Sequence, residues 1–121
     1  MNAALYVGAI IGCGFGAVFR YVLGRIDYGA DFPWHTVIAN AVASGLVGVL
    51  AALSTAHPGW MLVLGAGLGG GLSTFSSLAV DAIELWNEGR KRATISYLVV
   101  TCILGFTFAA AGWAIATTAT A

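Results

Sequence analysis

The chain has 121 residues, of which 60% are hydrophobic and 8% are charged, and its formal net charge is zero. Because proteins carry about 25% charged residues on average, this composition and the mean hydropathy of +0.91 indicate an integral membrane protein. The zero net charge excludes the strongly basic surface that nucleic-acid binding requires.

Four apolar stretches are close to the roughly 20 residues that span the hydrocarbon of a bilayer. They run over Ala3–Leu23, Thr36–Leu53, Trp60–Trp86 and Ala93–Ile115, and the four tryptophans fall at or near their ends. Indole rings favour the membrane interface, which supports these boundaries. We therefore expect an all-α protein with a single four-helix transmembrane domain over residues 1–121, a multi-pass protein of the cell (plasma) membrane in contact with lipid.

The first stretch carries a stripe of small residues. Gly8, Gly12, Gly16, Arg20 and Gly24 recur at every fourth position, which places them on one helix face. For the glycines this spacing indicates a seam where another helix packs closely. Two interpretations are open for Arg20, since it could extend to lipid headgroups or close a water-filled vestibule that attracts anions.

The second stretch carries a stripe of Thr36, Asn40, Ser44 and Gly48. A buried asparagine amide is costly unless its hydrogen-bonding groups are satisfied. Asn40 is therefore either a hydrogen-bonding residue between helices or a donor to a bound or permeating anion.

The segment from Gly69 to Leu78 places three glycines and four hydroxyl side chains in the overlong third stretch. Backbone that leaves the helical ladder inside a bilayer must be buried in protein or line a water-filled cavity. We therefore expect the third transmembrane helix to be broken near its middle, at a place where something polar passes or binds.

The fourth stretch has the corresponding stripe Tyr97, Thr101 and Gly105. A helical threonine often bonds to its own helix carbonyl, so Thr101 either does this or faces a pore. Hydroxyls and an amide offer hydrogen-bond donors without fixed charge, which suits a small ion that must exchange its water and then leave.

The connections between the stretches are short, so the functional site is expected between the helices. A subunit of four closely packed spans can hardly enclose a polar pathway, and an oligomer is expected.

Cys13 and Cys102 lie within spans and form no disulfide or metal motif. No nucleotide-binding motif and no grouped nucleophile, base and orienting residue occur, which indicates a protein that is not an enzyme.

These motifs together resemble the Fluc (CrcB) family of fluoride channels over essentially the whole chain. The resemblance rests on Gly-x-x-x-Arg20-Tyr21, the Thr36 to Gly48 stripe, Gly70-Gly-Leu-Ser-Thr-Phe-Ser-Ser, and the Tyr97 to Gly105 stripe. It implies an antiparallel, dual-topology dimer with two narrow pores and passive export of fluoride.

The resemblance also implies roles for individual residues. Asn40 would donate hydrogen bonds to fluoride, and Phe75 would offer the ion its electropositive ring edge. The backbone carbonyls of Gly70 and Ser73 would hold a structural sodium ion shared by the two subunits. The remaining residues expected on the fluoride pathway are Ser44, Thr74, Ser76, Tyr97, Thr101 and, at the vestibule, Arg20.

Two positions depart from the family pattern. Leu78 stands where a second phenylalanine is usual, so this residue provides no second positive ring edge. Gly45 stands where a large apolar residue is usual.

Alternative functions remain open at this stage. Arg25 and Arg90–Arg92 put the positive loops on one side. By the positive-inside rule this bias favours one orientation, and therefore an oppositely oriented homologous partner chain in place of a second copy.

A small multidrug-resistance exporter would need a carboxylate in the first helix, whereas Asp81 and Glu84 lie near the end of the third span, as expected for interfacial charges beside Arg90–Arg92. A non-transporting assembly subunit is a third possibility.

Overall fold

The computed structural model of the chain describes residues 3–26, 28–29, 32–54 and 56–120, and all regular structure in these residues is helical. Four segments are long and apolar enough to cross a membrane, namely Ala3–Arg25, Trp34–Ala52, Met61–Asn87 and Lys91–Ala119. The prediction of an all-α protein with four such helices is confirmed. In chain order the elements are α1 (Ala3–Arg25), α2 (Trp34–Ala52), α3 (Pro58–Trp60), η1 (Met61–Gly69, π-helical), α4 (Gly70–Leu72), α5 (Ser76–Asn87) and α6 (Lys91–Thr120).

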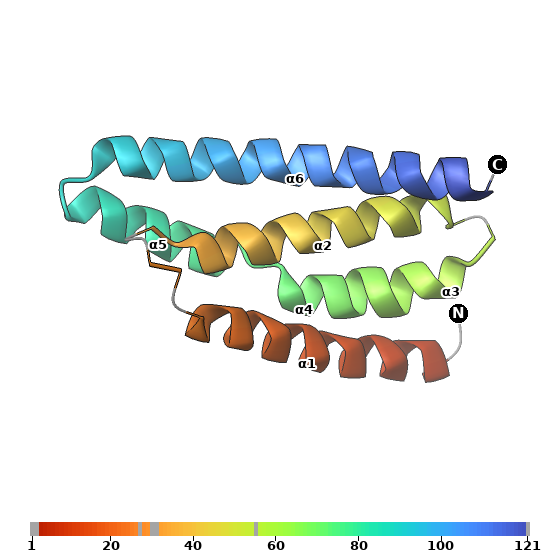
Figure 1. The fold of residues 1–121 in the computed structure, drawn as a ribbon. Helices are drawn as coiled ribbons and strands as arrows, with labels where there is room; N and C mark the ends of the chain where they lie inside the picture. Colours follow the sequence, from red (N-terminus) through yellow and green to blue (C-terminus); the bar gives the residue numbers. More distant parts are fainter. Residues whose placement is uncertain (1–2, 27, 30–31, 55, 121) are drawn as a thin grey trace.

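The helices run alongside one another as a bundle (Figure 1). Helix α1 lies on the outside and packs against η1 and α4, whereas α2 packs along α6 and also touches η1. The third span changes neighbours along its length, because its first half contacts α1 and its second half, α5, contacts α6. The site described below lies where this change occurs.

Glycines allow the closest approaches between these helices. A Cβ atom added at Gly71 in α4 would collide with the Cys13 carbonyl of α1, and one at Gly48 in α2 would collide with the Ala109 carbonyl of α6. Within lipid, such backbone contact is a principal source of helix association. The predicted packing seam of the first helix is confirmed, since Gly12 and Gly16 lie against η1 and α4.

Large apolar side chains cover the outside of the bundle. Ile10 in α1 is 72% exposed, and α6 exposes Ile103 and Ile115 to a similar degree. This outward apolar surface is what a lipid environment requires. The buried core is correspondingly small, and its main cluster comprises Val37, Ala82, Leu85 and Tyr97, where α2, α5 and α6 meet.

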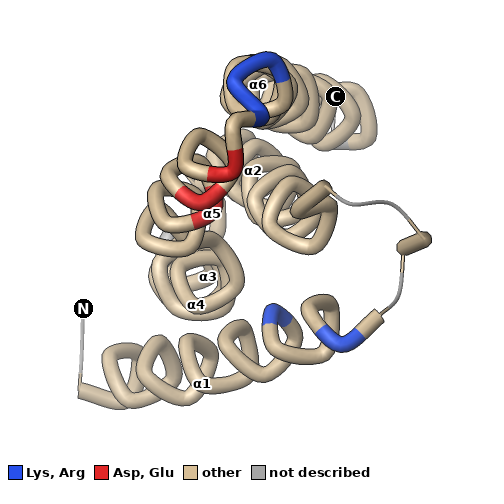
Figure 2. The backbone as a smooth tube through the Cα atoms, turned by 90° about the vertical axis from the view of Figure 1, so that its left-hand side faces the viewer, with Lys and Arg blue, Asp and Glu red and all other residues tan. Residues whose placement is uncertain are grey.

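The charged residues that the structure describes lie toward one end of the bundle (Figure 2). Arg25 ends α1, Arg90–Arg92 begin α6, and Glu84 and Glu88 lie near the end of α5. Lys91 lies over the ring of Trp86, 4.8 Å from its centroid. Both ends of the chain lie toward the other end of the bundle (Figure 1).

Candidate functional site

The helical backbone of the third span is interrupted after Leu72. Ser73 has φ −74° and ψ 157°, which is an extended conformation, and α5 begins at Ser76. The Ser73 N–H still donates to the Gly69 carbonyl at 2.9 Å, as at the end of a helix. The following residue, Thr74, lies between the two helices, so its backbone groups need other partners.

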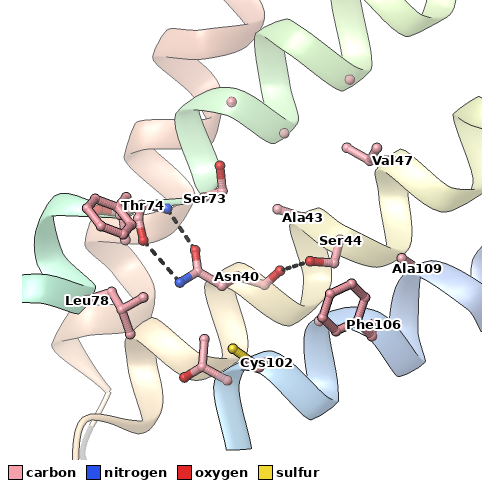
Figure 3. A pocket seen from close by; sticks show the side chains of 16 residues that line it. Asn40, Ala43, Ser44, Val47, Ser73, Thr74, Leu78, Cys102, Phe106 and Ala109 are labelled. Carbon is pink, nitrogen blue, oxygen red and sulfur yellow. Dashed lines mark hydrogen bonds between the residues drawn. The ribbon is translucent and has the colours of Figure 1, made fainter. Parts of the chain in front are cut away.

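Asn40 of α2 supplies those partners. Its Oδ1 accepts a hydrogen bond from the Thr74 N–H at 2.7 Å, and its Nδ2 donates to the Thr74 carbonyl at 3.1 Å (Figure 3). This two-point contact defines which way the amide is turned. A side-chain amide has two N–H groups, so one N–H remains after the Thr74 carbonyl has been satisfied. Asn40 thus holds the interruption, which agrees with the interpretation of a hydrogen-bonding residue between helices.

The hydroxyl of Thr74 organises the start of α5. Its Oγ1 accepts a hydrogen bond from the Ser77 N–H at 3.0 Å and lies 3.4 Å from the Ser76 hydroxyl. The first N–H groups of a helix lack partners within the helix, and a threonine oxygen is a common substitute. Thr74 therefore contributes its backbone to Asn40 and its side chain to α5.

A cavity of about 670 Å³ opens beside this contact (Figure 3). Most of its lining is apolar or glycine, and the polar side chains that reach it come from α2, the interruption and α6. Of the predicted pathway residues, the structure brings to this cavity Asn40, Ser44, Thr74, Phe75 and Thr101, together with Gly70, Ser73 and Leu78.

Two hydroxyl groups along the cavity already donate their hydrogens. Ser44 Oγ donates to the Asn40 carbonyl at 2.8 Å, and Thr101 Oγ1 donates to the Tyr97 carbonyl at 2.7 Å. Thr101 therefore bonds to its own helix, as one of its two interpretations predicts, and it also lines the cavity. Either hydroxyl could donate to a bound ligand only by giving up its bond to the helix.

The phenyl ring of Phe75 is 81% exposed in the single chain, although it lies within a membrane span. Leu78, one helical turn further along α5, also lines the cavity and is half-buried against the core cluster. Ser76 is exposed at the start of α5 and is not part of the cavity lining.

Arg20 contacts the interruption from α1. Its Nη1 donates to the Ser73 carbonyl at 3.4 Å. The side chain also lines a second cavity of about 320 Å³ near the charged end of the bundle. Arg25, His35, Thr36 and Ser77 line this cavity as well.

Tyr97 lies apart from the cavity that holds Asn40. It has no exposed surface, and its hydroxyl donates to Asp81 Oδ2 at 3.1 Å, the same oxygen that accepts from the Thr36 hydroxyl at 2.9 Å. Sequence reasoning missed this cluster because Asp81 was interpreted as an interfacial charge. Asp81 and Glu84 do line a small cleft that includes Arg90, but Asp81 also binds inside the bundle. A carboxylate within an apolar span was the signal that could have indicated such a role.

Comparison with known proteins adds a family to this geometry. Residues 7–113 match the family described as "CrcB-like protein, Camphor Resistance (CrcB)". Similar proteins named "Fluoride-specific ion channel FluC" occur in several organisms. The one from Pyrococcus horikoshii is 40% identical over 94 residues, 74% of this chain and 76% of its own. The one from Bordetella pertussis is 35% identical over 96 residues, 76% and 75% of the two chains. The one from Xylella fastidiosa strain M23 is 33% identical over 119 residues, 89% and 90% of the two chains.

Proposed function

The chain belongs to the CrcB-like family, and from this membership we propose that it is a passive, fluoride-selective channel that exports fluoride from the cytoplasm and confers fluoride resistance. It is a multi-pass membrane protein with four spanning helices. The observation that carries the proposal is its identity of 33% to 40%, over most of its length, to proteins named fluoride-specific ion channels. This similarity does not favour a multidrug exporter or an assembly subunit.

The chemistry of the cavity supports the same proposal. Asn40 brings a neutral N–H group to a largely apolar cavity, and Phe75 brings an aromatic ring whose edge is electropositive. Neutral donors can replace part of the water around a small anion without holding it as tightly as a fixed positive charge would. Such a site permits both entry and release, which conduction requires.

A passive pore is sufficient for export. Hydrogen fluoride is a weak acid that can cross lipid as a neutral molecule and dissociate inside, where the anion is trapped. A negative-inside membrane potential drives an anion outward by about 2.3 kcal/mol per charge for each 100 mV. A fluoride pathway therefore needs no coupled energy source.

In the proposed pathway, fluoride accepts a hydrogen bond from the Asn40 N–H that the Thr74 carbonyl does not take, and it meets the ring edge of Phe75. The interruption of the third span serves as the break at which the ion passes. Arg20 attracts the ion at the vestibule, where the second cavity also brings Arg25 close. The remaining pathway residues are the hydroxyl groups of Ser44, Thr74, Ser76, Tyr97 and Thr101.

We propose that two copies of the chain form an antiparallel dimer. Phe75 is 81% exposed beside the cavity, so a single copy does not enclose the pathway. A second copy laid against this face would cover the ring and complete the cavity. Tagging the carboxy terminus and labelling cells that express this chain alone tests the arrangement. Equal labelling from both sides supports a homodimer, whereas labelling from one side alone indicates a differently oriented partner chain.

The carbonyl groups of Gly70 and Ser73 would hold a structural sodium ion between the two copies. Hard cations take oxygen ligands, and the carbonyl end of a helix carries partial negative charge. A Cβ added at Gly70 would meet nothing within 4 Å, which leaves room for a second chain to approach. These residues fit a cation, although Arg20 already donates to one of the two carbonyls. The ion's contribution would be to hold the subunits together.

A fluoride-efflux assay on liposomes containing only this polypeptide tests the proposed function, with chloride as the control anion. We expect fluoride efflux well above that of protein-free liposomes and little chloride efflux. Comparable rates for the two anions, or no fluoride efflux, would contradict the proposal.

A further inference from the structure

The cavity beside Asn40 contains a second exposed phenyl ring, that of Phe106 in α6. Its side chain is 79% exposed, nearly as much as that of Phe75. In Figure 3 the Phe106 ring lies next to Ser44 and Ala109, on the opposite side of Asn40 from Leu78. The lining of the cavity therefore includes two aromatic residues, Phe75 beside the interruption and Phe106 in α6.

The rings of Phe75 and Phe106 are important to an anion because few other groups with a positive charge or partial charge face this cavity. The hydroxyl hydrogens of Ser44 and Thr101 are donated to carbonyl groups of their own helices. The Thr74 oxygen accepts from Ser77, and Arg20 lines the other cavity. Among the residues that line the larger cavity, the remaining groups with a partial positive charge include the second N–H of Asn40, the hydroxyl hydrogen of Ser73 and the ring edges of Phe75 and Phe106.

Leu78 lines the same cavity but brings no aromatic ring to it. Its branched aliphatic side chain fills space but offers an anion no positive edge, and it is packed against the core cluster of Val37, Leu85 and Tyr97. Without Phe106, Phe75 would be the one aromatic side chain among the residues that line the cavity. Ser44 leads from Asn40 toward Phe106, because its Oγ lies 3.4 Å from a Cβ added at Gly105, the residue that precedes Phe106.

From this arrangement we infer that Phe106 supplies the second aromatic edge that contacts fluoride, in place of the edge that Leu78 does not provide. The inference rests on the proposed function. An anion moving along the lining passes from the edge of Phe75 to the Asn40 N–H and then to the edge of Phe106. Phe106 thus contributes to fluoride selectivity from α6, whereas Leu78 serves packing alone.

Fluoride efflux from liposomes tests Phe106 with a matched pair of variants. Phe106→Ile removes the ring and keeps an apolar side chain, and Phe15→Ile makes the same change at an exposed residue of α1 that is not part of the cavity lining. We expect Phe106→Ile to slow fluoride efflux at least fivefold and Phe15→Ile to leave it within twofold of the parent. A slowing of less than fivefold by Phe106→Ile overturns the inference.

A second variant separates the ring edge from the shape of the side chain. Incorporating pentafluorophenylalanine at position 106 keeps the ring but makes its edge negative, so efflux should again fall at least fivefold. If Phe106→Ile fails to fold, this variant decides alone, and parent-like efflux through it overturns the inference. Failure of the parent to pass fluoride refutes the proposed function itself. A conducting parent with an equally fast position-106 variant refutes only the role of Phe106.

Discussion

Two polar contacts join α2 to the third span one helical turn apart, and they differ in charge and in what they bind. Asn40 uses a neutral amide to hold the backbone of Thr74, next to a cavity. Thr36, one turn earlier, donates its hydroxyl to the carboxylate of Asp81, which also accepts from Tyr97. The first contact provides hydrogen-bond partners for the N–H and the carbonyl of Thr74, which lies between two helices. The second contact provides two hydroxyl donors for the Asp81 carboxylate inside the bundle.

Under the proposed function, this difference favours one of the two contacts as the place where an anion binds. The amide of Asn40 forms hydrogen bonds with the N–H and the carbonyl of Thr74, and one of its two N–H groups remains available as a donor. The carboxylate of Asp81 repels an anion, and its neighbours Thr36 and Tyr97 have 1% and 0% exposure. An anion is therefore expected at the neutral contact, and at the charged contact it must compete with Asp81 for the hydroxyl hydrogen of Tyr97.

Making the neutral contact negative should have the largest effect. Asn40→Asp adds a negative charge at the proposed fluoride site and removes the donor to the Thr74 carbonyl. Two like charges about 4 Å apart repel by about 4 kcal/mol at an effective dielectric constant of about 20, so we expect fluoride efflux to fall at least about 100-fold. Asn87→Asp adds the same charge at the exposed end of α5 and should leave efflux unchanged. Parent-like conduction by a folded Asn40→Asp protein would place the pathway elsewhere.

Removing the ring edge beside the neutral contact should have the next largest effect. Phe75→Ile keeps an apolar side chain at a position that is 81% exposed in the single chain. Aromatic rings contribute about 0.5–1.5 kcal/mol through the geometry of their edges and faces, which corresponds to a loss of up to about tenfold in efflux. Size-exclusion chromatography should show the same oligomeric state as that of the parent protein. An efflux rate equal to that of the parent would exclude Phe75 from the pathway.

At the charged contact, Tyr97→Phe should mainly affect stability. The variant removes one of the two hydroxyl donors to Asp81 and leaves an apolar ring in the same buried space. A hydrogen bond to a charged group contributes about 1.5–3 kcal/mol, so the thermal unfolding midpoint should decrease. Because Tyr97 is one of the proposed pathway residues, we also expect efflux to decrease severalfold, although this residue lies apart from the cavity. If stability and efflux are both unchanged, the cluster has neither role.

Ser44→Ala should have the smallest effect. Its hydroxyl hydrogen is donated to the Asn40 carbonyl, so it can bind an anion only after breaking that bond. A neutral hydrogen bond contributes about 1 kcal/mol, which limits the expected loss of efflux to about fivefold. A loss as large as that of Asn40→Asp would mean that Ser44, and not the amide, is the principal donor.

The sequence was sufficient to single out the residue and the segment that meet at the neutral contact. Asn40 and the Gly69–Leu78 segment stand out because polar groups and glycines are costly inside an apolar span. Their pairing could not be predicted, since Asn40 and Thr74 are 34 positions apart. Whether Asn40 meets backbone, side chain or solvent depends on how α2 is rotated against the third span.

The charged contact was less accessible to sequence reasoning. Asp81 lies near the basic loop in the sequence, which supported an interfacial role, and it does share a cleft with Arg90. Its hydroxyl donors come from α2 and α6, and no spacing rule connects Thr36, Asp81 and Tyr97. The position of Phe106 was missed for the same reason, because one exposed phenylalanine in an apolar helix resembles any other.

By itself, the sequence determined that this is an all-helical membrane protein with four spanning helices, that glycine seams bring the helices together, and that its motifs resemble those of a fluoride channel family. These properties follow from apolar length and local periodicity, which each helix carries independently. Tertiary structure alone decided that Asn40 forms hydrogen bonds with the Thr74 backbone, that Asp81 accepts hydrogen bonds from two hydroxyl groups, and that Phe106 lines the cavity. These contacts depend on helix rotation and depth, which are set by packing across the whole bundle.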